Sequence, residues 1–383
     1  MLSLMYSWSD SPDDVIDLLP YCSDNGIAIT VQRNTIGTLS ISIKYRVILA
    51  LLLQQGLTLD QFLVERYARV TLYQDGDMVF GGFLSAFPAV QSSSIDADIP
   101  LVFNSWLGLT TGGYVGPVES FTDNLDAILV RKLRDNINAS GSGRKPWPLS
   151  IGHCDSLARV QWDITSFKQL NDFLVERTDN STGAGPFDIN FTPDGVFEIY
   201  RNYGVNLTAS MNLRFGGPQQ NVTDFDFPLF DNASTDVVLS GAGNGYGGQG
   251  TAIVSRQSNP DSRKRHYWGM LIAQDSSITT RNVLDDAARK KLKYTASPIA
   301  TPTISINANE LGLRIREHAQ HGDLWLGDVV RVTPEGIYST YPHADSYRID
   351  KMEITISREQ VTTVKLTMVD PTGAELKDEV END

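Results

Sequence analysis

The stretch Ala68–Leu84 reads ARVTLYQDGDMVFGGFL and predicts two antiparallel strands joined by a tight turn. Apolar Val70 and Leu72 alternate with polar neighbours, which is the two-residue period of a strand buried on one face. Asp75-Gly76 then supplies the residue types that tolerate the backbone angles of a two-residue hairpin turn. The start of the chain is therefore expected to be rich in β-structure.

A second alternating pair of segments lies near the other end of the chain, within Tyr347–Met368. Its apolar positions are Met352, Ile354, Ile356, Val364, Leu366 and Met368. Similar hairpins at both ends predict two related β-modules around a middle region. We therefore expect a mainly β fold with an α+β insertion, in which two tube-like β-barrel or sandwich domains flank a helix-containing middle domain.

The chain has 383 residues, which exceeds what one ordinary hydrophobic core supports. We expect a first tube-like β domain over 1–113, an inserted α+β domain over 114–230, and a second tube-like β domain over 231–372. The last domain is expected to contain a helix over 280–293, since acidic residues come early there and basic residues late. Residues 373–383 are expected to form an acidic flexible tail.

Two helices are predicted in the insertion. Thr122 is expected to cap the first, whose apolar residues recur at spacings of three and four. Ser166 and Gln169 match a capping box and predict the start of the second, with Phe167 in its apolar stripe. The apolar run Val47–Leu53 is ambiguous between a short helix and a buried strand.

The chain is acidic, with a formal net charge of −14. Proteins that hold phosphate backbones need a basic face, and basic residues cluster here only in 263–265 and 289–293. Specific nucleic-acid binding is therefore not expected, whereas an acidic wall would repel DNA that slides past it. No apolar run approaches the roughly 20 residues of a membrane span, and the first residues do not resemble a cleaved signal peptide.

Two motifs suggest ligand binding but lack a required feature. Gly245, Gly247 and Gly250 match the spacing of a dinucleotide-binding loop, yet the next residues, TAIVSR, predict a strand where a helix N-terminus is needed. His318 and His321 with Asp323 offer metal-ligand chemistry, but their neighbours predict a polar loop without a metalloprotease glutamate. We therefore expect no cofactor and no metal site.

The residues His153-Cys154-Asp155 could pose as a nucleophile with its base. Adjacent residues on a strand point to opposite faces, so a buried structural cysteine is the better interpretation of Cys154. The other cysteine, Cys22, is distant in sequence, and two cysteines cannot form a disulfide framework.

Carboxylate pairs could also suit glycoside hydrolysis, which requires a set separation that sequence does not show. Asp163 with Glu176 is one such pair, and Asp123 with Asp126 is another, although a helix start already explains the second. Aromatic residues could line a sugar groove, but in β proteins they more often lie in the core. These are Trp147, Trp162, Trp268 and Trp325. No catalytic residue is therefore assigned.

The unit ARVTLYQDGDMVFGGFLSAF is followed by the alternating segment Ile95–Phe103 and the apolar run Trp106–Leu109. Together these segments resemble the opening module of tail hub proteins of long-tailed phages (siphophages). The segments GDLWLGDVVRVTPEG and YRIDKMEITISREQVTTVKLTMVD are similar to the closing module of that family, with Gly327-Asp328-Val329-Val330 as the strand entry. The glycine loop and the helix expected over 280–293 are similar to the middle-to-late region, and residues 114–230 match least.

The resemblance implies a non-enzymatic structural protein, a tail-tip or baseplate hub (minor tail protein) of the virion that is made in the host cytoplasm. It implies a homotrimer whose ring continues the hexameric tail tube, adapts it to threefold tip components and lines the DNA channel. Implied partners are the tail tube or distal tail protein above and a spike or tape measure protein below, without stable membrane insertion. Two other functions stay open, a tail-associated cell-wall hydrolase and a host carbohydrate-binding module.

Overall fold

The structure is a computed structural model that describes the chain apart from a set of short segments. The residues outside the description are 1, 12, 24–25, 89–93, 117–118, 139–144, 165, 176–177, 179–186, 227–234, 242–253, 261–269, 275–280, 282–283, 286–287, 290–291, 293–301, 318–322, 341–342, 358 and 370–383. Strands are the main elements of the described residues, and a few helices accompany them, which confirms the expected mainly β class. No helix in these residues combines the length and apolar character needed to cross a bilayer.

The N-terminal module alternates short strands with two helices. Its elements are β1 (Leu2–Ser7), β2 (Val15–Asp17), β3 (Ile27–Gln32), β4 (Thr38–Lys44), α1 (Tyr45–Gln55), α2 (Leu59–Phe62), β5 (Arg69–Gln74), β6 (Asp77–Leu84) and β7 (Asp98–Ser105). The predicted hairpin is β5 and β6, and Asp75 and Gly76 in its turn both have positive φ. The run Val47–Leu53 lies within the helix α1, which ends at Gly56 with a φ of +67°.

The C-terminal module contains the second predicted hairpin, β24 and β25. Its elements are β15 (Asn212–Phe215), β16 (Asp224–Asp226), β20 (Thr303–Asn307), β21 (Arg314–Ile315), β22 (Asp323–Leu324), β23 (Val329–Pro334), β24 (Ser346–Ile356) and β25 (Thr362–Val369). Residues 212–226, which we expected in the insertion, pair with β23 and β20, so by strand pairing they belong with this module.

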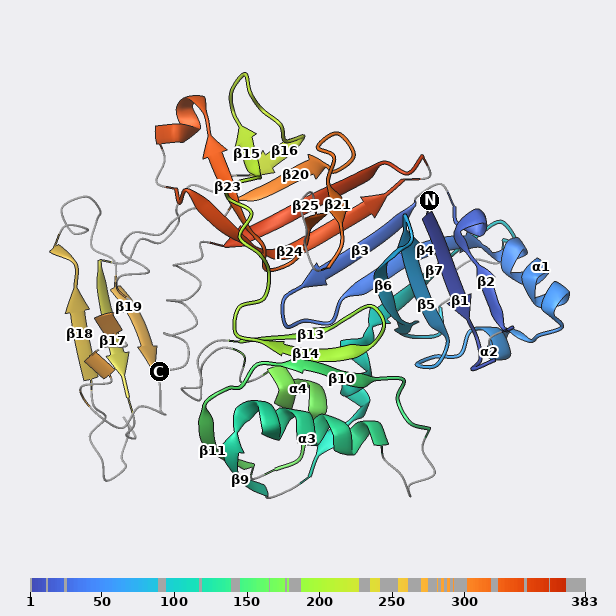
Figure 1. The fold of residues 1–383 in the computed structure, drawn as a ribbon, viewed down its shortest axis with the longest axis horizontal. Coiled ribbons are helices and arrows are strands. Elements are labelled where there is room, and N and C mark those ends of the chain that lie inside the picture. The colour runs from blue at the N-terminus through green and yellow to red at the C-terminus, as the bar shows by residue number, and fades with distance from the viewer. Residues whose placement is uncertain are drawn as a thin grey trace.

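Thirteen of the described strands form one sheet, in the order β16-β20-β25-β24-β3-β4-β7-β6-β5-β1-β2, with β23 and β15 joined beside β24. The end modules meet where β3 and β24 pair antiparallel, from Gln32 opposite Lys351 to Ile27 opposite Ile356. Figure 1 shows these N-terminal and C-terminal strands side by side. The two expected tube-like modules are thus joined edge to edge rather than separate, since each would otherwise leave a strand edge unpaired.

Each end module also curls back on itself. In the N-terminal module the chain after β2 returns to β4, where Cys22 forms an isolated bridge with Ile43. In the C-terminal module the connection between β15 and β16 folds back, and the Asn221 N–H donates to the Arg214 carbonyl at 3.1 Å.

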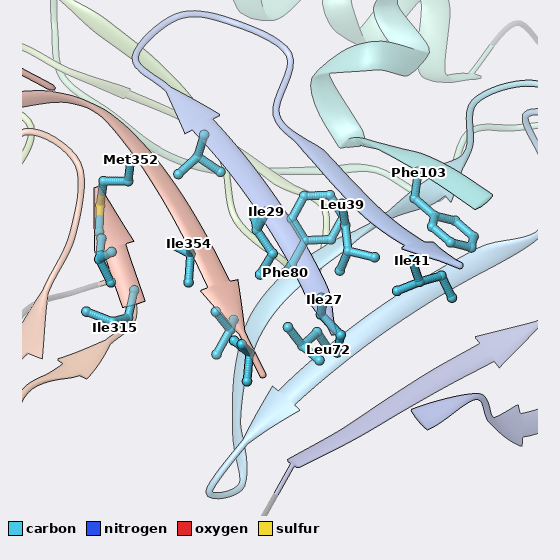
Figure 2. Packing of buried hydrophobic residues seen from close by; sticks show 14 of the residues in the cluster. Ile27, Ile29, Leu39, Ile41, Leu72, Phe80, Phe103, Ile315, Met352 and Ile354 are labelled. Atoms are coloured by element: carbon cyan, nitrogen blue, oxygen red, sulfur yellow. The ribbon is translucent and has the colours of Figure 1, made fainter. Parts of the chain in front are cut away.

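One hydrophobic core underlies the whole sheet. Figure 2 shows the side chains of Ile27 and Ile29 from β3 beside Ile354 from β24 and Leu39 from β4. These residues are almost fully buried, and they belong to one cluster that extends from the first strand to the last. Because this cluster crosses the boundary between the two modules, they share a single packed core.

The insertion has a second core and lies against one side of the sheet (Figure 1). Its elements are a 3-10 helix (Trp106–Gly112), β8 (Tyr114–Val115), β9 (Glu119–Asn124), α3 (Leu125–Asn138), β10 (Ser150–Cys154), β11 (Arg159–Ile164), β12 (Lys168–Gln169), α4 (Leu170–Val175), β13 (Asp188–Phe191) and β14 (Val196–Tyr200). Trp162 stacks on Phe173 with ring centroids 4.2 Å apart, and this pair holds β11 against α4.

Both insertion helices begin later than their capping signals predicted. Thr122 lies in β9 opposite Gln161, so it does not cap α3, which starts at Leu125. Gln169 lies in β12, α4 starts at Leu170, and the side chain of Phe167 is 65% exposed rather than part of the apolar stripe. Strand pairing with residues distant in the sequence satisfies these backbone groups, so the local capping signals are not used.

A small α/β unit is inserted between β16 and β20 and lies beside the rest of the molecule in Figure 1. Its strands are β17 (Asp236–Ser240), β18 (Val254–Ser258) and β19 (Met270–Gln274). The described residues within 281–292 are helical, in agreement with the helix expected over 280–293. Buried Leu284, Ala288 and Leu292 repeat every four residues and pack on Val237 of β17, which forms a third, separate core.

Candidate functional site at the junction of the modules

A buried carboxylate joins the N-terminal module, the insertion and the C-terminal module. Asp188, the first residue of β13, has a side chain that is only 3% exposed. Its Oδ1 accepts hydrogen bonds from Arg33 Nε and Nη2, at 2.9 and 2.7 Å, while its Oδ2 accepts from Arg348 at 3.2 Å. Arg33 follows β3 and Arg348 belongs to β24. Charge-assisted bonds of this type are stronger than neutral ones, so Asp188 fixes the three modules in one arrangement.

The backbone around Asp188 is held as well. Asn34, which has a φ of +54°, accepts a hydrogen bond from the Ile189 N–H at 2.9 Å through its side-chain oxygen. Arg348 also donates to the carbonyls of Tyr203 and Gly327, at 2.7 and 3.2 Å. The junction is therefore a connected polar network, and a network of this kind selects one geometry most strongly when its members are satisfied.

The Gly327-Asp328 pair at the predicted strand entry ties the end of the insertion to the C-terminal module. Asp328 is buried, and its carboxylate accepts hydrogen bonds from the Val205 N–H at 2.7 Å and the Trp325 N–H at 2.8 Å. Burial raises the pKa of Asp328 to about 6, because desolvation disfavours the charged form. Gly327 and Gly204 both have positive φ, and a Cβ added to Gly204 would lie 2.1 Å from the Gly327 carbonyl carbon. Two glycines are therefore required where these backbones cross.

Further polar contacts link the tip of the first hairpin to the same region. Arg316 binds Asp77, the first residue of β6, at 2.5 Å, and Asp323 at 2.7 Å. The hydrogen bond to Asp323 raises the pKa of Arg316 above its ordinary value. Tyr203 donates to Glu317 at 2.6 Å, and burial raises the pKa of the Tyr203 hydroxyl well above its usual range. These groups hold the hairpin, the insertion and the C-terminal module together.

The N-terminal module also contacts the insertion through close backbone packing. The Trp106 indole N–H donates to the Pro193 carbonyl at 2.7 Å. A Cβ on Gly81 would lie 1.7 Å from that same carbonyl oxygen, so only glycine fits at this point of β6. The cavity that remains between Arg33, Asp188 and these residues has a volume of about 70 Å³. That volume suits a few water molecules rather than an organic substrate.

The polar groups of the junction bind each other or backbone groups. Its charged groups are paired with each other, and no nucleophile beside a base belongs to the network described above. In the described part of the chain, no cluster of three or more His, Cys, Asp or Glu side chains is placed to hold a metal ion. What the geometry provides is a connection between the N-terminal module, the insertion and the C-terminal module.

The residues of the sequence-selected binding motifs lie outside the description except for Asp323, which takes part in the polar contacts beside the junction. Gly245, Gly247 and Gly250 lie outside the described residues, as do His318 and His321. Asp323 is buried, lies in β22 and pairs with Arg316.

His153-Cys154-Asp155 and the second cysteine do not form a nucleophilic site. His153 Nε2 lies 3.0 Å from Asp155 Oδ1, and Cys154 packs half-buried beside the insertion core. Burial raises the pKa of Cys154 to about 11 and that of Cys22 to about 12, so both thiols are held away from the reactive thiolate form.

The structure describes both members of only one of the two carboxylate pairs, Asp123 with Asp126. Asp123 lies in β9, and Asp126 is in the first turn of α3, where it accepts a hydrogen bond from the Leu157 N–H at 2.8 Å. Asp163 lies in β11 with a side chain outside the description, and Glu176 is outside it altogether. Among the selected tryptophans, Trp162 and Trp325 are buried in the cores, Trp147 is partly buried, and Trp268 is outside the description.

Sequence reasoning did not find the residues that make the junction. Asp188 is the second residue of the segment Phe187–Phe191, FDINF, and the one local signal is a carboxylate between an aromatic and an apolar residue. Arg33 and Arg348 look like ordinary charged residues at strand ends, and 315 positions separate them. Only the tertiary pairing of β3 with β24 brings them to the same carboxylate.

Comparison with known proteins gives a fold relationship without a sequence relationship. Neither a protein family nor a curated protein matches the sequence. The tail protein from Neisseria meningitidis MC58 superposes with a TM-score of 0.61 at 13% identity, over 99% of both chains. The 43 kDa tail protein of prophage MuSo2 from Shewanella oneidensis gives 0.60 at 10% identity, over 97% of this chain and 99% of that one.

A third structure agrees with these two. The prophage tail protein gp18 from Listeria monocytogenes EGD-e has a TM-score of 0.54 at 13% identity, over 99% of this chain and 98% of that one. The matches span all three modules, so they concern the whole arrangement rather than one common β-domain. The resemblance that the two end modules suggested is thus confirmed at the level of the fold, and this chain has the fold of phage tail proteins.

Proposed function

We propose that the chain is a structural subunit of a phage tail tip, a baseplate hub whose sheet forms the wall of the DNA channel. The fold shared with three tail proteins supports a place in the tail. The observation that carries the finer proposal is the outer face of the central sheet, which continues without a break from one end module into the other.

This outer face is named here the hydroxyl face, and it comprises the side chains opposite the core on six neighbouring strands. Strand pairing aligns them in rows, and one row reads Ser305, Lys365, Glu353, Thr30, Thr38 and Asn104 across β20, β25, β24, β3, β4 and β7. A second row reads Asn307, Thr363, Thr355, Ala28, Ser40 and Val102. Six of these twelve side chains are serine or threonine, so short hydroxyl groups are the commonest kind on this surface.

The charges on the hydroxyl face neutralise each other. Glu353 lies 2.6 Å from Lys351 and 3.8 Å from Lys365, and Lys44 lies 3.5 Å from Asp98. These three lysines lie against two carboxylates, and the neighbouring strand β16 adds the exposed Asp224 and Asp226 opposite Ser305 and Thr303. The face is therefore close to neutral, in a chain whose net charge is −14. A wall that holds DNA needs cations free to replace counterions, and these lysines already have carboxylate partners. The face would let a phosphate backbone pass without retaining it, and the proposed wall is close to neutral rather than acidic.

The assembly that we propose is a homotrimer. Each chain carries two curved β-modules, so three chains supply six modules to continue a hexameric tube and adapt it to threefold tip components. Closed rings are the common solution for identical subunits, and ring closure would pair strand edges that a single chain leaves at the ends of its sheet. The proposed neighbours are the tail tube or distal tail protein above and a spike or tape measure protein below, in a virion assembled in the host cytoplasm.

We assign the junction a mechanical role within this hub, without enzymatic activity. Asp188 and its arginines would keep the two modules of each subunit at a fixed angle, and the angle decides whether three subunits close into a ring. The insertion then acts as a bracket on the outside of the wall, because it contacts both modules through Asp188 and Tyr203.

The first test is the mass of the purified protein under native conditions. We expect a species of three times 42.3 kDa in native mass spectrometry, in equilibrium with the monomer. The second test asks which face the ring encloses, using Thr355→Cys on the hydroxyl face and Arg159→Cys on the exposed side of β11 as the matched control. A small maleimide should label both variants, whereas a maleimide on a bulky dendrimer should label only Arg159→Cys in the trimer.

Two results would contradict the proposal. A protein that stays monomeric at every concentration, and also when mixed with its tail tube protein, would argue against the ring. A trimer in which the dendrimer labels Thr355→Cys as fast as Arg159→Cys would leave the ring but remove the hydroxyl face from its channel. The parent protein, which has only the half-buried Cys22 and Cys154, gives the background.

A further inference from the structure

A cavity of about 290 Å³ lies away from the junction, between the N-terminal module and the start of the insertion. The turn before β5 and the beginning of that strand form one wall, with Arg66, Tyr67 and Arg69, and the segment before β10 forms the other, with Lys145 and Trp147. The volume is close to that of the smaller ligand pockets of proteins, and more than four times that of the junction cavity.

The cavity is positively charged in an acidic protein. Its lining includes Arg66, Arg69 and Lys145 but one carboxylate, Asp10. Asp10 binds both Arg69 and Lys145, and the hydrogen bond from Lys145 lowers the pKa of Asp10 below its usual value. Arg66 has a second carboxylate nearby, since its Nε lies 3.9 Å from Glu65. Two carboxylates cannot neutralise three cations, so the cavity keeps an excess of one positive charge, and an anionic group would be attracted to it.

Arg66 is held in an unusual backbone conformation at the edge of this cavity. Its φ is +57°, which is unfavourable for a side chain with a Cβ, and its N–H donates to the Leu84 carbonyl at 2.9 Å. The guanidinium lies close to Gly112, since a Cβ there would be 3.1 Å from Nη1. Strained non-glycine residues concentrate at ligand sites, where the strain directs a side chain toward what it binds.

Aromatic and proline rings form the apolar part of the lining. Trp147 stands between Pro146 and Pro148, and the Lys145 ammonium lies 3.9 Å from the centroid of the Tyr67 ring. The Trp106 indole N–H donates to the Pro193 carbonyl, so the part of the ring that lines the cavity is apolar. Flat aromatic surfaces beside charged groups suit a ligand that has an apolar ring face as well as an anionic substituent.

We propose that this cavity binds an acidic saccharide, a pyranose ring that carries a carboxylate. Arg66 and Arg69 would hold the carboxylate, Trp147 and Tyr67 would pack against the C–H face of the ring, and Asp10 would accept hydrogen bonds from ring hydroxyls. Asp10 distinguishes this ligand from a simple anion, since a site for phosphate or acetate alone gains nothing from a carboxylate in its lining. The proposal does not depend on the hub assignment.

The test measures binding of defined sugars to the full-length protein by calorimetry and tryptophan fluorescence. The probes are glucuronic acid, N-acetylneuraminic acid and N-acetylmuramic acid, with glucose as the neutral match for the first. We expect at least one acidic sugar to bind with a dissociation constant below about 1 mM, and glucose to bind at least about tenfold more weakly.

Variants then locate the site. Arg69→Ala and Trp147→Ala should each weaken binding by about tenfold or more, which is the effect of one charged hydrogen bond or one aromatic contact. Arg159→Ala removes the same charge on exposed β11, outside the cavity, and should bind like the parent. Thermal unfolding identifies any variant that does not fold, and Arg69→Lys replaces Arg69→Ala in that case.

Three outcomes would overturn the proposal. One is the absence of measurable binding by all three acidic sugars up to about 10 mM, which is weaker than any useful affinity. Another is equal binding of acetate or of the peptide Ala-Glu-Glu-Ala, which would make the cavity a general anion site or a protein-docking site. The last is acidic-sugar binding that Arg69→Ala and Trp147→Ala leave unchanged, which would place the site elsewhere.

Discussion

Removal of the Asp188 carboxylate should loosen the connection between the three modules. The Asp188→Ala substitution takes away the acceptor that Arg33 and Arg348 share, and both arginine side chains are largely buried, at 12% and 17% exposure. Two guanidinium groups would then face each other without an anion between them. Because these groups are shielded from water, solvent cannot fully compensate for the lost charge.

The magnitude follows from the contacts that survive. Breaking a buried ion pair by removing one partner costs about 3–5 kcal/mol. Arg348 would keep its hydrogen bonds to the carbonyls of Tyr203 and Gly327, and Arg33 would keep Asp350 at 3.7 Å. We therefore expect the lower end of that range, about 3 kcal/mol. For a urea slope of about 3 kcal/mol per M, the unfolding midpoint would fall by roughly 1 M.

The assay is urea denaturation followed by circular dichroism and by tryptophan fluorescence. Asp350→Ala is the matched control, since Asp350 also faces Arg33 but is 27% exposed and farther away, and its loss should cost under about 1 kcal/mol. Three of the six tryptophans, Trp106, Trp147 and Trp162, belong to the insertion core or pack against it, so fluorescence weights the insertion more than circular dichroism does. In Asp188→Ala the fluorescence transition should therefore also separate from the circular dichroism transition. Equal midpoints for both variants would refute the idea that Asp188 holds the junction.

Three other predictions concern single residues. Gly204→Ala should lower the unfolding free energy by more than about 2 kcal/mol in the same urea assay, since its Cβ would meet the Gly327 backbone. Gly312 also has positive φ but lies beside open space, so Gly312→Ala should lower the unfolding free energy by only about 1–2 kcal/mol. Because burial raises the pKa of Asp328 to about 6, the folded state binds this proton more tightly than the unfolded state, where the pKa is about 3.9. The contribution of Asp328 to the unfolding free energy should therefore rise by up to about 3 kcal/mol as the pH falls from about 7 to about 4. Asp328→Asn should lack that increase, and an identical pH profile of the unfolding free energy for both proteins would contradict the prediction. Thr355→Arg adds a cation to the hydroxyl face. In electrophoretic mobility shifts we expect the parent not to retain duplex DNA, and we expect the variant to retain it at low salt and release it by about 200 mM salt. Retention by the variant that is independent of salt would contradict the reasoning.

Elements whose stability is local were predictable from the sequence. The hairpin β5–β6 depends on its alternation and on Asp75-Gly76, and the helix within 281–292 depends on a four-residue apolar repeat. Both signals lie within the element that they specify, so the element can be predicted without knowing its distant partners. The resemblance of the end modules to tail hub proteins came from the same alternation, and the fold comparison agrees with it.

Starts of helices were less predictable where a distant strand competes for the same backbone groups. Thr122 and Gln169 carry good capping signals, yet each pairs in a ladder with a partner about 40 to 55 residues away, Gln161 and Tyr114. A ladder satisfies several donors and acceptors at once, whereas a cap satisfies one or two, so the ladder decides the boundary. The ambiguity of Val47–Leu53 has a similar cause, because its periodicity fits both a helix and a buried strand until its packing is known.

The sequence by itself determined the mainly β class, the two end modules with a helical insertion between them, and the resemblance to phage tail hubs. All of these follow from patterns that repeat over two to four residues. Only the tertiary structure decided that the end modules share one sheet, that Asp188 lies between Arg33 and Arg348, and that the cavity beside Arg69 and Trp147 is positively charged. The physical reason is distance along the chain: these contacts join residues from 78 to more than 300 positions apart, and no local pattern encodes which distant edge a strand will pair with.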